Sequence, residues 1–273
     1  EVLAALIAER RVVLDDPLQR FAPQGGIVPI FPGGRALTLR DLAAHTAGLP
    51  RDNPPGLGRE GRWRWLERVT LPRAPGRIAQ YSNAGYMFLG DALEIAAATD
   101  MPALLARYVT APLTLDDTTL SPSADQCRRL MTGGSGDHPC APTLAIGAMG
   151  GAYSTAFDMA RWMRAHLSAA PGSPRWAAQQ PLVARGELER MIALDFAGEA
   201  DAIAMGWLVM RLGDVPVLQK TGGGGGFMNY VVLAPSHRKA MFVTVNRVDI
   251  EMLRKLTMRT NELMAKFLSR RER

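Results

Sequence analysis

The chain has 273 residues, of which 47% are apolar and 21% are charged, and its formal net charge is +6. This length and composition suit one large domain or two fused lobes, and they exclude a disordered chain. The 32 basic residues include only four lysines and are scattered along the sequence, which disfavours nucleic-acid binding. No stretch approaches the roughly 18 apolar residues of a membrane-spanning helix.

The N-terminal part of the sequence predicts short helices separated by loops rich in proline and glycine. An apolar helical face at residues 2–7 follows Glu1 directly, without an N-cap residue or a signal peptide, so we expect a segment upstream of Glu1. The elements predicted next are a loop at 14–36, a helix capped by Thr38, a helix at about 59–70 and a long helix capped by Asn83.

The pattern changes from helix to strand after residue 200. Helices are predicted at about 101–110, at 155–168 with Ser154 as the cap, and at 182–194. Strand-like runs follow at 204–212, 215–220, 227–235 and 239–247, and an amphipathic helix at 249–270. The runs predict an antiparallel meander with a helix on one face. The expected fold is therefore α/β, of the α+β type, with one domain over 1–273: a mainly helical lobe at 1–200, then the sheet and last helix at 201–273.

The sequence argues against several common catalytic centres. The four histidines, at positions 45, 138, 166 and 237, are far apart and form no His-Glu-x-x-His motif. The glycine run after Lys220 follows a Lys-Thr pair, whereas a phosphate-binding P-loop needs its glycines before that pair. No Gly-x-Ser-x-Gly nucleophile elbow is present. We expect no metal and no cofactor.

Two motifs remain that carry chemistry: Tyr81-Ser82-Asn83 at a helix start, and Lys220-Thr221-Gly222 at the end of a strand. A lysine in this place puts a positive charge beside a nucleophile and a substrate carboxylate, and the threonine offers a hydroxyl to the same anion. The glycines leave the strand edge without side chains, so that a substrate backbone can pair along it. Lys-Thr-Gly occurs in serine penicillin-recognising enzymes, and the Tyr-x-Asn upstream strengthens an otherwise weak signal.

The order of the segments LDDPL, LTLRDLAAHTAGLP, YSN, GGAYSTAFDMARWM and KTGG resembles that of class C β-lactamases and their penicillin-binding relatives. The segments DQCRRLM and QKTGGGGGF, with the second cysteine, are similar to AmpH-type D-alanyl-D-alanine carboxypeptidase/endopeptidases. The resemblance covers nearly the whole chain and implies a serine β-lactamase/DD-peptidase fold. It also implies acyl transfer from D-Ala-D-Ala or cross-link peptides of peptidoglycan in the periplasm, acylation by β-lactams, and weak β-lactamase activity as an option. Peripheral membrane association stays open.

The resemblance assigns the two catalytic residues. Tyr81 would shuttle the proton, held as a phenolate by two lysines, and Lys220 would support it. Burial alone raises a tyrosine pKa from about 10, so nearby cations must supply the opposite shift. We therefore expect the Tyr81 hydroxyl and the Lys220 ammonium to lie within a few ångström of each other.

The resemblance also assigns four residues to the substrate. Asn83 would hold the amide carbonyl, and Thr221 and Gly222 would line the edge along which the substrate lies. The backbone amide of Gly223 would form half of the oxyanion hole, a group typically worth about 2.7–4 kcal/mol of barrier.

The nucleophile of the family is the serine of a Ser-x-x-Lys motif at a helix start, and here the sequence departs from the pattern. Only Ser236 is followed three residues later by a lysine, Lys239, and this pair falls in a turn after Lys-Thr-Gly. We expect the true motif upstream of Glu1, so that the 273-residue chain lacks its nucleophile and is inactive by itself. Two alternatives stay open: an esterase that acts on small acyl esters, and a non-catalytic peptidoglycan-binding module.

Six further residues have structural interpretations. Cys127 and Cys140 could be two free thiols or close a loop, and the implied periplasm favours the disulfide. His45 is interpreted as a packing and hydrogen-bonding residue. Trp63 and Trp65 belong to the core rather than to a sugar platform. Asp158, near a helix start, is interpreted as a partner of the helix dipole.

Overall fold

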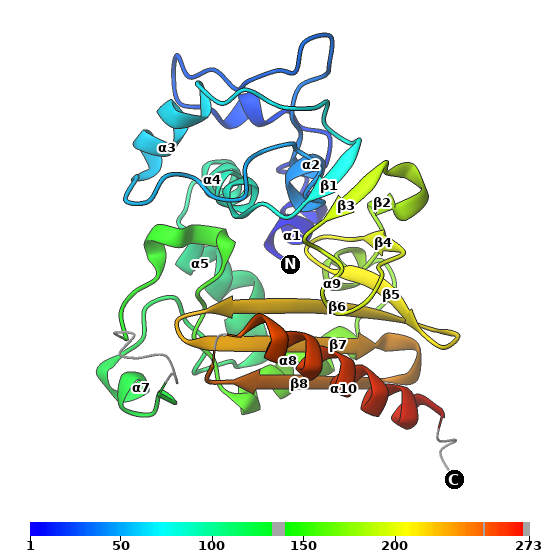
Figure 1. The fold of residues 1–273 in the computed structure, drawn as a ribbon. Helices are drawn as coiled ribbons and strands as arrows, with labels where there is room; N and C mark the ends of the chain where they lie inside the picture. The colour runs from blue at the N-terminus through cyan, green and yellow to red at the C-terminus, as the bar shows by residue number, and fades with distance from the viewer. Residues whose placement is uncertain (133–139, 248, 270–273) are drawn as a thin grey trace.

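The computed structural model describes residues 1–132, 140–247 and 249–269, in which a helical region stands above a six-stranded sheet (Figure 1). The described α-helices are α1 Val2–Ala8, α2 Leu39–Ala43, α3 Arg59–Leu66, α4 Asn83–Ala97, α5 Met101–Leu105, α6 Ala111–Leu113, α7 Ala124–Arg128, α8 Ala156–Leu167, α9 Pro174–Ala177 and α10 Ile250–Ser269. The described strands are β1 Ile78–Gln80, β2 Val183–Ala184, β3 Arg190–Ile192, β4 Ala202–Ile203, β5 Leu208–Leu212, β6 Val215–Gly224, β7 Phe227–Ala234 and β8 Lys239–Val245.

The large sheet has the strand order β2-β4-β5-β6-β7-β8, and every neighbouring pair is antiparallel. The predicted meander is thus confirmed as β5 to β8. The sheet begins earlier than the predicted boundary at residue 201, because β2 pairs with β4. A separate two-stranded parallel sheet joins β1 to β3, and it ties the helical region to the chain segment that leads into the large sheet.

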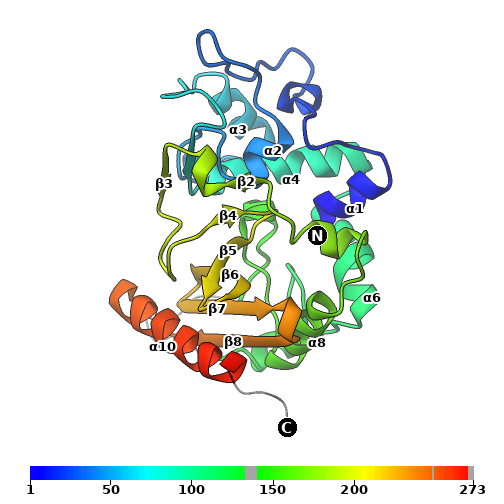
Figure 2. The ribbon, with the colours of Figure 1, turned by 90° about the vertical axis from the view of Figure 1, so that its right-hand side faces the viewer.

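Helices cover both faces of the large sheet (Figure 2). On one face Met264 of α10 packs against Tyr230 and Val232, and the Tyr230 hydroxyl donates a hydrogen bond of 2.7 Å to Asn261. On the other face Trp162 of α8 stacks on Trp207, with ring centroids 5.6 Å apart. Successive residues of a strand point to opposite faces, so both sides of the central strands are apolar and α10 takes the role predicted for the last helix.

The helical region is built around α4, whose Phe88 is fully buried. Trp63 of α3 is buried and meets Phe88 edge-on, and Trp65 stacks on the same ring. Both tryptophans are therefore core residues, as predicted. Arg62 of α3 forms an ion pair with the buried carboxylate of Asp91 on α4, which fixes the two helices to each other.

The structure corrects three local predictions. Residues 182–194 form no α-helix but two short strands around a 3-10 turn at Arg185–Glu187, because Val183–Ala184 and Arg190–Ile192 pair with strands β4 and β1 and this tertiary pairing overrides a weak helical pattern. The cap of α4 is Ser82, whose Oγ accepts from the amide of Gly85, and Asn83 is the first helical residue. The cap of α8 is Thr155 rather than Ser154, for the same kind of bond.

A disulfide joins Cys127 at the end of α7 to Cys140, with their Cα atoms 5.6 Å apart. The span between them includes residues 133–139, His138 among them, which lie outside the described residues.

Asp158 does more than face the helix dipole: its buried carboxylate accepts from the amide of Asp117 and from the Thr118 hydroxyl. Among the described helices, none combines the length and apolarity needed to cross a membrane.

Candidate active site

The glycine-rich end of β6 has one bare edge. β5 pairs with β6 only as far as Gln219, whereas β7 pairs with it from Leu218 to Gly224. The segment from Lys220 to Gly224 therefore has a strand partner on one side only, and Figure 1 shows it running past the end of β5. A Cβ placed on Gly222 would meet no heavy atom within 4 Å. Packing thus does not require glycine at this position. The glycine is explained instead by the open space that it leaves along the edge of the strand.

The turn that ends β6 does need glycine. Gly225 and Gly226 have φ angles of 57° and 82°, in the left-handed region where glycine is unstrained. They reverse the chain so that Gly224 pairs with Phe227 at the start of β7. The run of five glycines therefore has two parts: an open strand end at 222–224 and a tight turn at 225–226.

Tyr81 is held at the junction between β1 and α4. Its backbone amide donates to the carbonyl of Ile192, which extends the parallel pairing of β1 with β3. The next residue, Ser82, caps α4, and its hydroxyl donates a 2.6 Å hydrogen bond to the carbonyl of Pro50. The backbone of Tyr81 is thus fixed on both sides, and its half-buried side chain projects toward β6.

Lys220 and Tyr81 meet although they are far apart in sequence. The Lys220 ammonium lies over the Tyr81 ring, 4.7 Å from its centroid, and donates to the carbonyl of Thr221 at 3.3 Å. A cation over an aromatic face is attracted by the ring's quadrupole, typically by about 0.5–2 kcal/mol. Burial lowers the pKa of Lys220 from 10.5 to about 8, so the amine is still mostly protonated at neutral pH.

The pKa of Tyr81 lies above its ordinary value of 10, opposite to the expected direction. Burial is the main cause, and the positive charge of Arg51 offsets it only in part while Asp52 adds to it. Arg51 lies near the ring of Tyr81, with its guanidinium carbon 5.6 Å from the centroid. Among the described residues, the cations near Tyr81 are too few to hold a phenolate near neutral pH.

Asn83 follows Tyr81 by two residues, and its side chain is hydrogen-bonded to a loop residue. Its side-chain amide donates a 2.6 Å hydrogen bond to Asp52, and its backbone amide donates to the carbonyl of Arg51. One amide hydrogen of Asn83 is thus committed to the loop, and the second remains for a substrate carbonyl.

Sequence reasoning missed Arg51 and Asp52. The available signal was a pair of charges directly after the AHTAGLP segment, which belongs to one of the family-like motifs. Loop residues that follow such a motif face the helix start on which Asn83 stands, and this can be seen only once the loop is folded.

Ser236 lies at the wrong end of the sheet to serve as the nucleophile. It stands in the turn after β7, and the register that pairs Leu233 with Leu218 puts this turn level with the start of β6, at the opposite end of the strand from Gly224. Its hydroxyl contacts the ring of His237 at 3.0 Å. The structure therefore does not bring Ser236 together with Tyr81 and Lys220.

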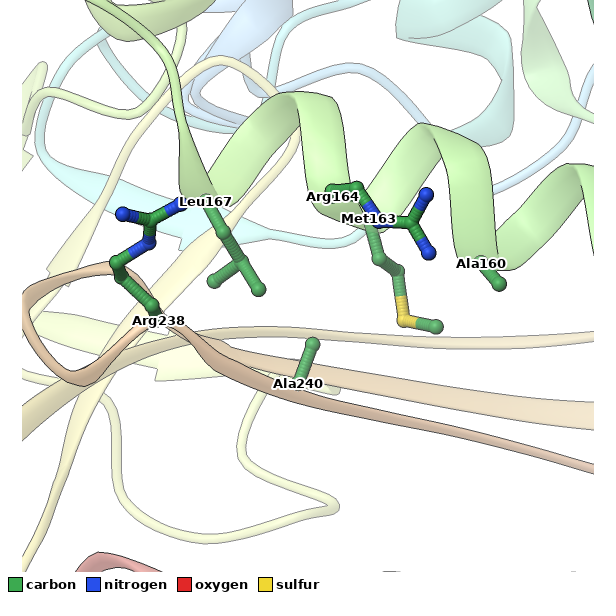
Figure 3. A pocket seen from close by; sticks show the side chains of 6 residues that line it. All are labelled: Ala160, Met163, Arg164, Leu167, Arg238 and Ala240. Atoms are coloured by element: carbon green, nitrogen blue, oxygen red, sulfur yellow. The ribbon is translucent and has the colours of Figure 1, made fainter. Parts of the chain in front are cut away.

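An open cavity of about 410 Å³ lies between α8 and the start of β8 (Figure 3). It is lined by Ala160, Met163, Arg164, Leu167, Arg238 and Ala240. In the close-up, Met163 and Leu167 point from α8 toward Ala240 on the strand. None of the predicted site residues lines it, so this cavity is separate from the candidate site.

The sequence comparisons identify the family. Residues 1–263 match the Beta-lactamase family model. The D-alanyl-D-alanine-carboxypeptidase/endopeptidase AmpH of Escherichia coli K12 is 39% identical over 278 residues, which cover 97% of this chain and 72% of that protein.

The structural comparisons agree. A β-lactamase/D-alanine carboxypeptidase from Yersinia pestis, solved with citrate, superposes with a TM-score of 0.92 at 36% identity, over 98% of this chain and 80% of that one. A class C β-lactamase from Rhodobacter sphaeroides shares the fold, with a TM-score of 0.74 at 19% identity over 96% and 82% of the two chains. These matches confirm the predicted fold, and the chain belongs to the β-lactamase family of serine hydrolases.

Proposed function

We propose that this chain carries the Tyr-x-Asn and Lys-Thr-Gly walls of an acyl-transfer site that cleaves D-Ala-D-Ala or cross-link peptides of peptidoglycan. The observation that carries the proposal is the contact between the Lys220 ammonium and the Tyr81 ring. The names of the E. coli and Y. pestis relatives support this class of substrate, since both include D-alanine carboxypeptidase.

In this mechanism the substrate backbone lies along the bare edge of β6. Asn83 donates to the carbonyl of the preceding residue, and the amide of Gly223 donates to the carbonyl oxygen that becomes negative in the transition state. A serine oxygen attacks the carbonyl carbon, the bond to the terminal D-alanine breaks, and water later releases the acyl group. Tyr81 takes the serine proton and returns it to the leaving amine.

Tyr81 can accept a proton only if its pKa falls. Burial raises it in this chain, and the positive charge of Arg51 acts against the rise. The lysine of a Ser-x-x-Lys motif would add a second positive charge at the phenol. We propose that this motif lies outside the 273 residues, because the one Ser-x-x-Lys within them ends at Lys239, in the distant turn. Because the proposed substrate is peptidoglycan, we place the working protein in the periplasm, where β-lactams also reach it.

The test uses the natural protein extended upstream through an in-frame Ser-x-x-Lys, with release of D-alanine from a D-Ala-D-Ala peptide as the readout. Tyr81→Phe removes the proton shuttle and is expected to lower kcat by about 10²–10⁴-fold. Tyr108→Phe is the matched control, because Tyr108 donates its hydroxyl to Glu9 away from the site, and it should leave the rate unchanged.

The alternatives give different outcomes in the same assay. An esterase hydrolyses a small acyl ester but releases no D-alanine from the peptide. A binding module takes up the peptide without turnover of either substrate. Equal rates for Tyr81→Phe and Tyr108→Phe would refute the role of Tyr81.

A further inference from the structure

His45 stands directly behind the candidate site. It follows α2 and its C-cap, and its φ of 57° places it in the left-handed region, which is uncommon for a residue with a side chain. The resulting turn directs the ring inward, where its centroid lies 4.8 Å from the Tyr81 ring and 4.7 Å from the Tyr86 ring. His45 is buried, with 5% of its surface exposed.

His45 accepts two hydrogen bonds, one from the residue before Tyr81 and one from the residue after it. The carbonyl of His45 accepts from the amide of Gln80 at 2.8 Å, and its Nδ1 accepts from the amide of Ser82 at 3.2 Å. These are the residues immediately before and after Tyr81. Because Ser82 also caps α4, the bond from Nδ1 fixes the point at which strand β1 turns into that helix.

The geometry requires a neutral ring. Nδ1 can accept from Ser82 only if it carries no proton, so the ring hydrogen sits on Nε2. The groups packed on the ring agree with this assignment. Burial and the positive charge of Lys220 lower the pKa of His45 to about 3, and Tyr86 hydrogen-bonds its hydroxyl to the carbonyl of Ala43 rather than to the ring.

We propose that His45 is a positioning residue for Tyr81: its Nδ1, as a hydrogen-bond acceptor, sets the place of the phenol opposite Lys220. A neutral acceptor does this without adding a second positive charge beside the ammonium. This inference rests on the proposed role of Tyr81 and adds that the role depends on a residue that need not touch the substrate.

Two substitutions separate the acceptor from the turn. His45→Asn keeps an acceptor at nearly the position of Nδ1, and asparagine tolerates a positive φ. His45→Gly also tolerates the turn but has no acceptor. The two variants thus share the backbone conformation and differ in the acceptor, the group under test.

The first readout is the pKa of Tyr81 in the 273-residue chain. It is obtained from ultraviolet titration of tyrosinate, as the difference between each protein and its Tyr81→Phe version, with circular dichroism to confirm folding. Asparagine should leave the raised pKa in place. Glycine should release the phenol to water and lower its pKa toward 10.

The second readout is the acylation rate by a fluorescent penicillin in the upstream-extended protein. His45→Asn should stay within about threefold of the natural protein, and His45→Gly should lose about 10–100-fold, since a misplacement near 1 Å can cost two orders of magnitude. If the natural protein is not acylated at all, the proposed function fails, and the tyrosine titration still decides the role of His45.

The proposal is overturned if both variants leave the pKa of Tyr81 unchanged, or if both shift it equally. Should His45→Gly not fold, His45→Asn alone decides. A Tyr81 pKa that returns toward 10 in a folded His45→Asn protein contradicts the role of Nδ1, and a retained shift supports it.

Discussion

At the scale of single residues, the site is a small set of charged groups around the half-buried ring of Tyr81. Lys220 keeps its ammonium over Tyr81 although burial lowers its pKa to about 8. Because the folded pKa lies below the ordinary 10.5, the unfolded chain binds more protons between these two pH values. The stabilising contribution of this group is fully present above pH 10.5 and is lost as the pH falls through about 8.

This linkage gives a testable consequence. Lys220→Met removes the amine, so the free energy of unfolding of the variant should lack the rise with pH that Lys220 contributes between about 8 and 10.5. Urea unfolding of both proteins at a series of pH values measures the difference. Parallel pH profiles for the two proteins would mean that Lys220 has its ordinary pKa.

Some site residues could be identified from the sequence and others could not. Tyr81 and Lys220 were identified because they stand in short motifs whose order matches that of the family. Their contact geometry could not be read, and neither could the upward shift of the Tyr81 pKa, because burial depends on the whole fold. Arg51 was missed for the same reason: only the folded loop brings its charge to the phenol.

At the scale of elements, the open end of β6 should tolerate side chains structurally but not functionally. A Cβ on Gly222 would meet nothing within 4 Å, so Gly222→Ala should leave the unfolding free energy within about 0.5 kcal/mol. In the upstream-extended protein the same methyl group would stand on the edge where we place the substrate, and D-alanine release should fall at least about tenfold.

The control for this variant is Gly186→Ala. A Cβ on Gly186 also meets nothing within 4 Å, and this residue lies in the short turn between β2 and β3. It should change neither stability nor rate. A Gly222→Ala protein with full activity would show that the substrate does not lie along this edge.

The link between α3 and α4 predicts a large effect on stability. Asp91 is buried and paired with Arg62, which is itself buried, so Asp91→Ala leaves an uncompensated charge and should cost about 3–5 kcal/mol. Asp125→Ala breaks an exposed pair with Arg128 and should cost less than about 1 kcal/mol. Urea unfolding of both variants measures the contrast, and similar losses would contradict it.

The elements themselves were predictable where the pattern was strong. The β5–β8 meander and α10 follow a clear alternation of period two and then a helical face, so both were found. The segment 182–194 was predicted wrongly, since two- and three-residue strands carry almost no periodicity of their own and exist through pairing with β4 and β1. The capping errors at Ser82 and Thr155 shifted helix starts by one residue, within the usual uncertainty of helix ends.

At the scale of the whole molecule, the β-lactamase-family fold brings a junction in the helical region against the end of a central strand. The parallel pairing of β1 with β3 and the edge of β6 together place Tyr81 opposite Lys220. The architecture therefore brings together the residues that we propose as proton shuttle, supporting lysine and substrate edge. On our account it does not supply the attacking oxygen, because Ser236 stands level with the start of β6, at the opposite end of the strand from Gly224.

The most direct test of this account is covalent labelling by a fluorescent penicillin, resolved on a denaturing gel. The 273-residue chain should not label, whereas the natural protein extended through an in-frame Ser-x-x-Lys should. In that extended protein Lys220→Ala should lose most of the labelling rate and Ser236→Ala should lose none. Covalent labelling of the 273-residue chain by itself, abolished by Ser236→Ala, would contradict our placement of the nucleophile.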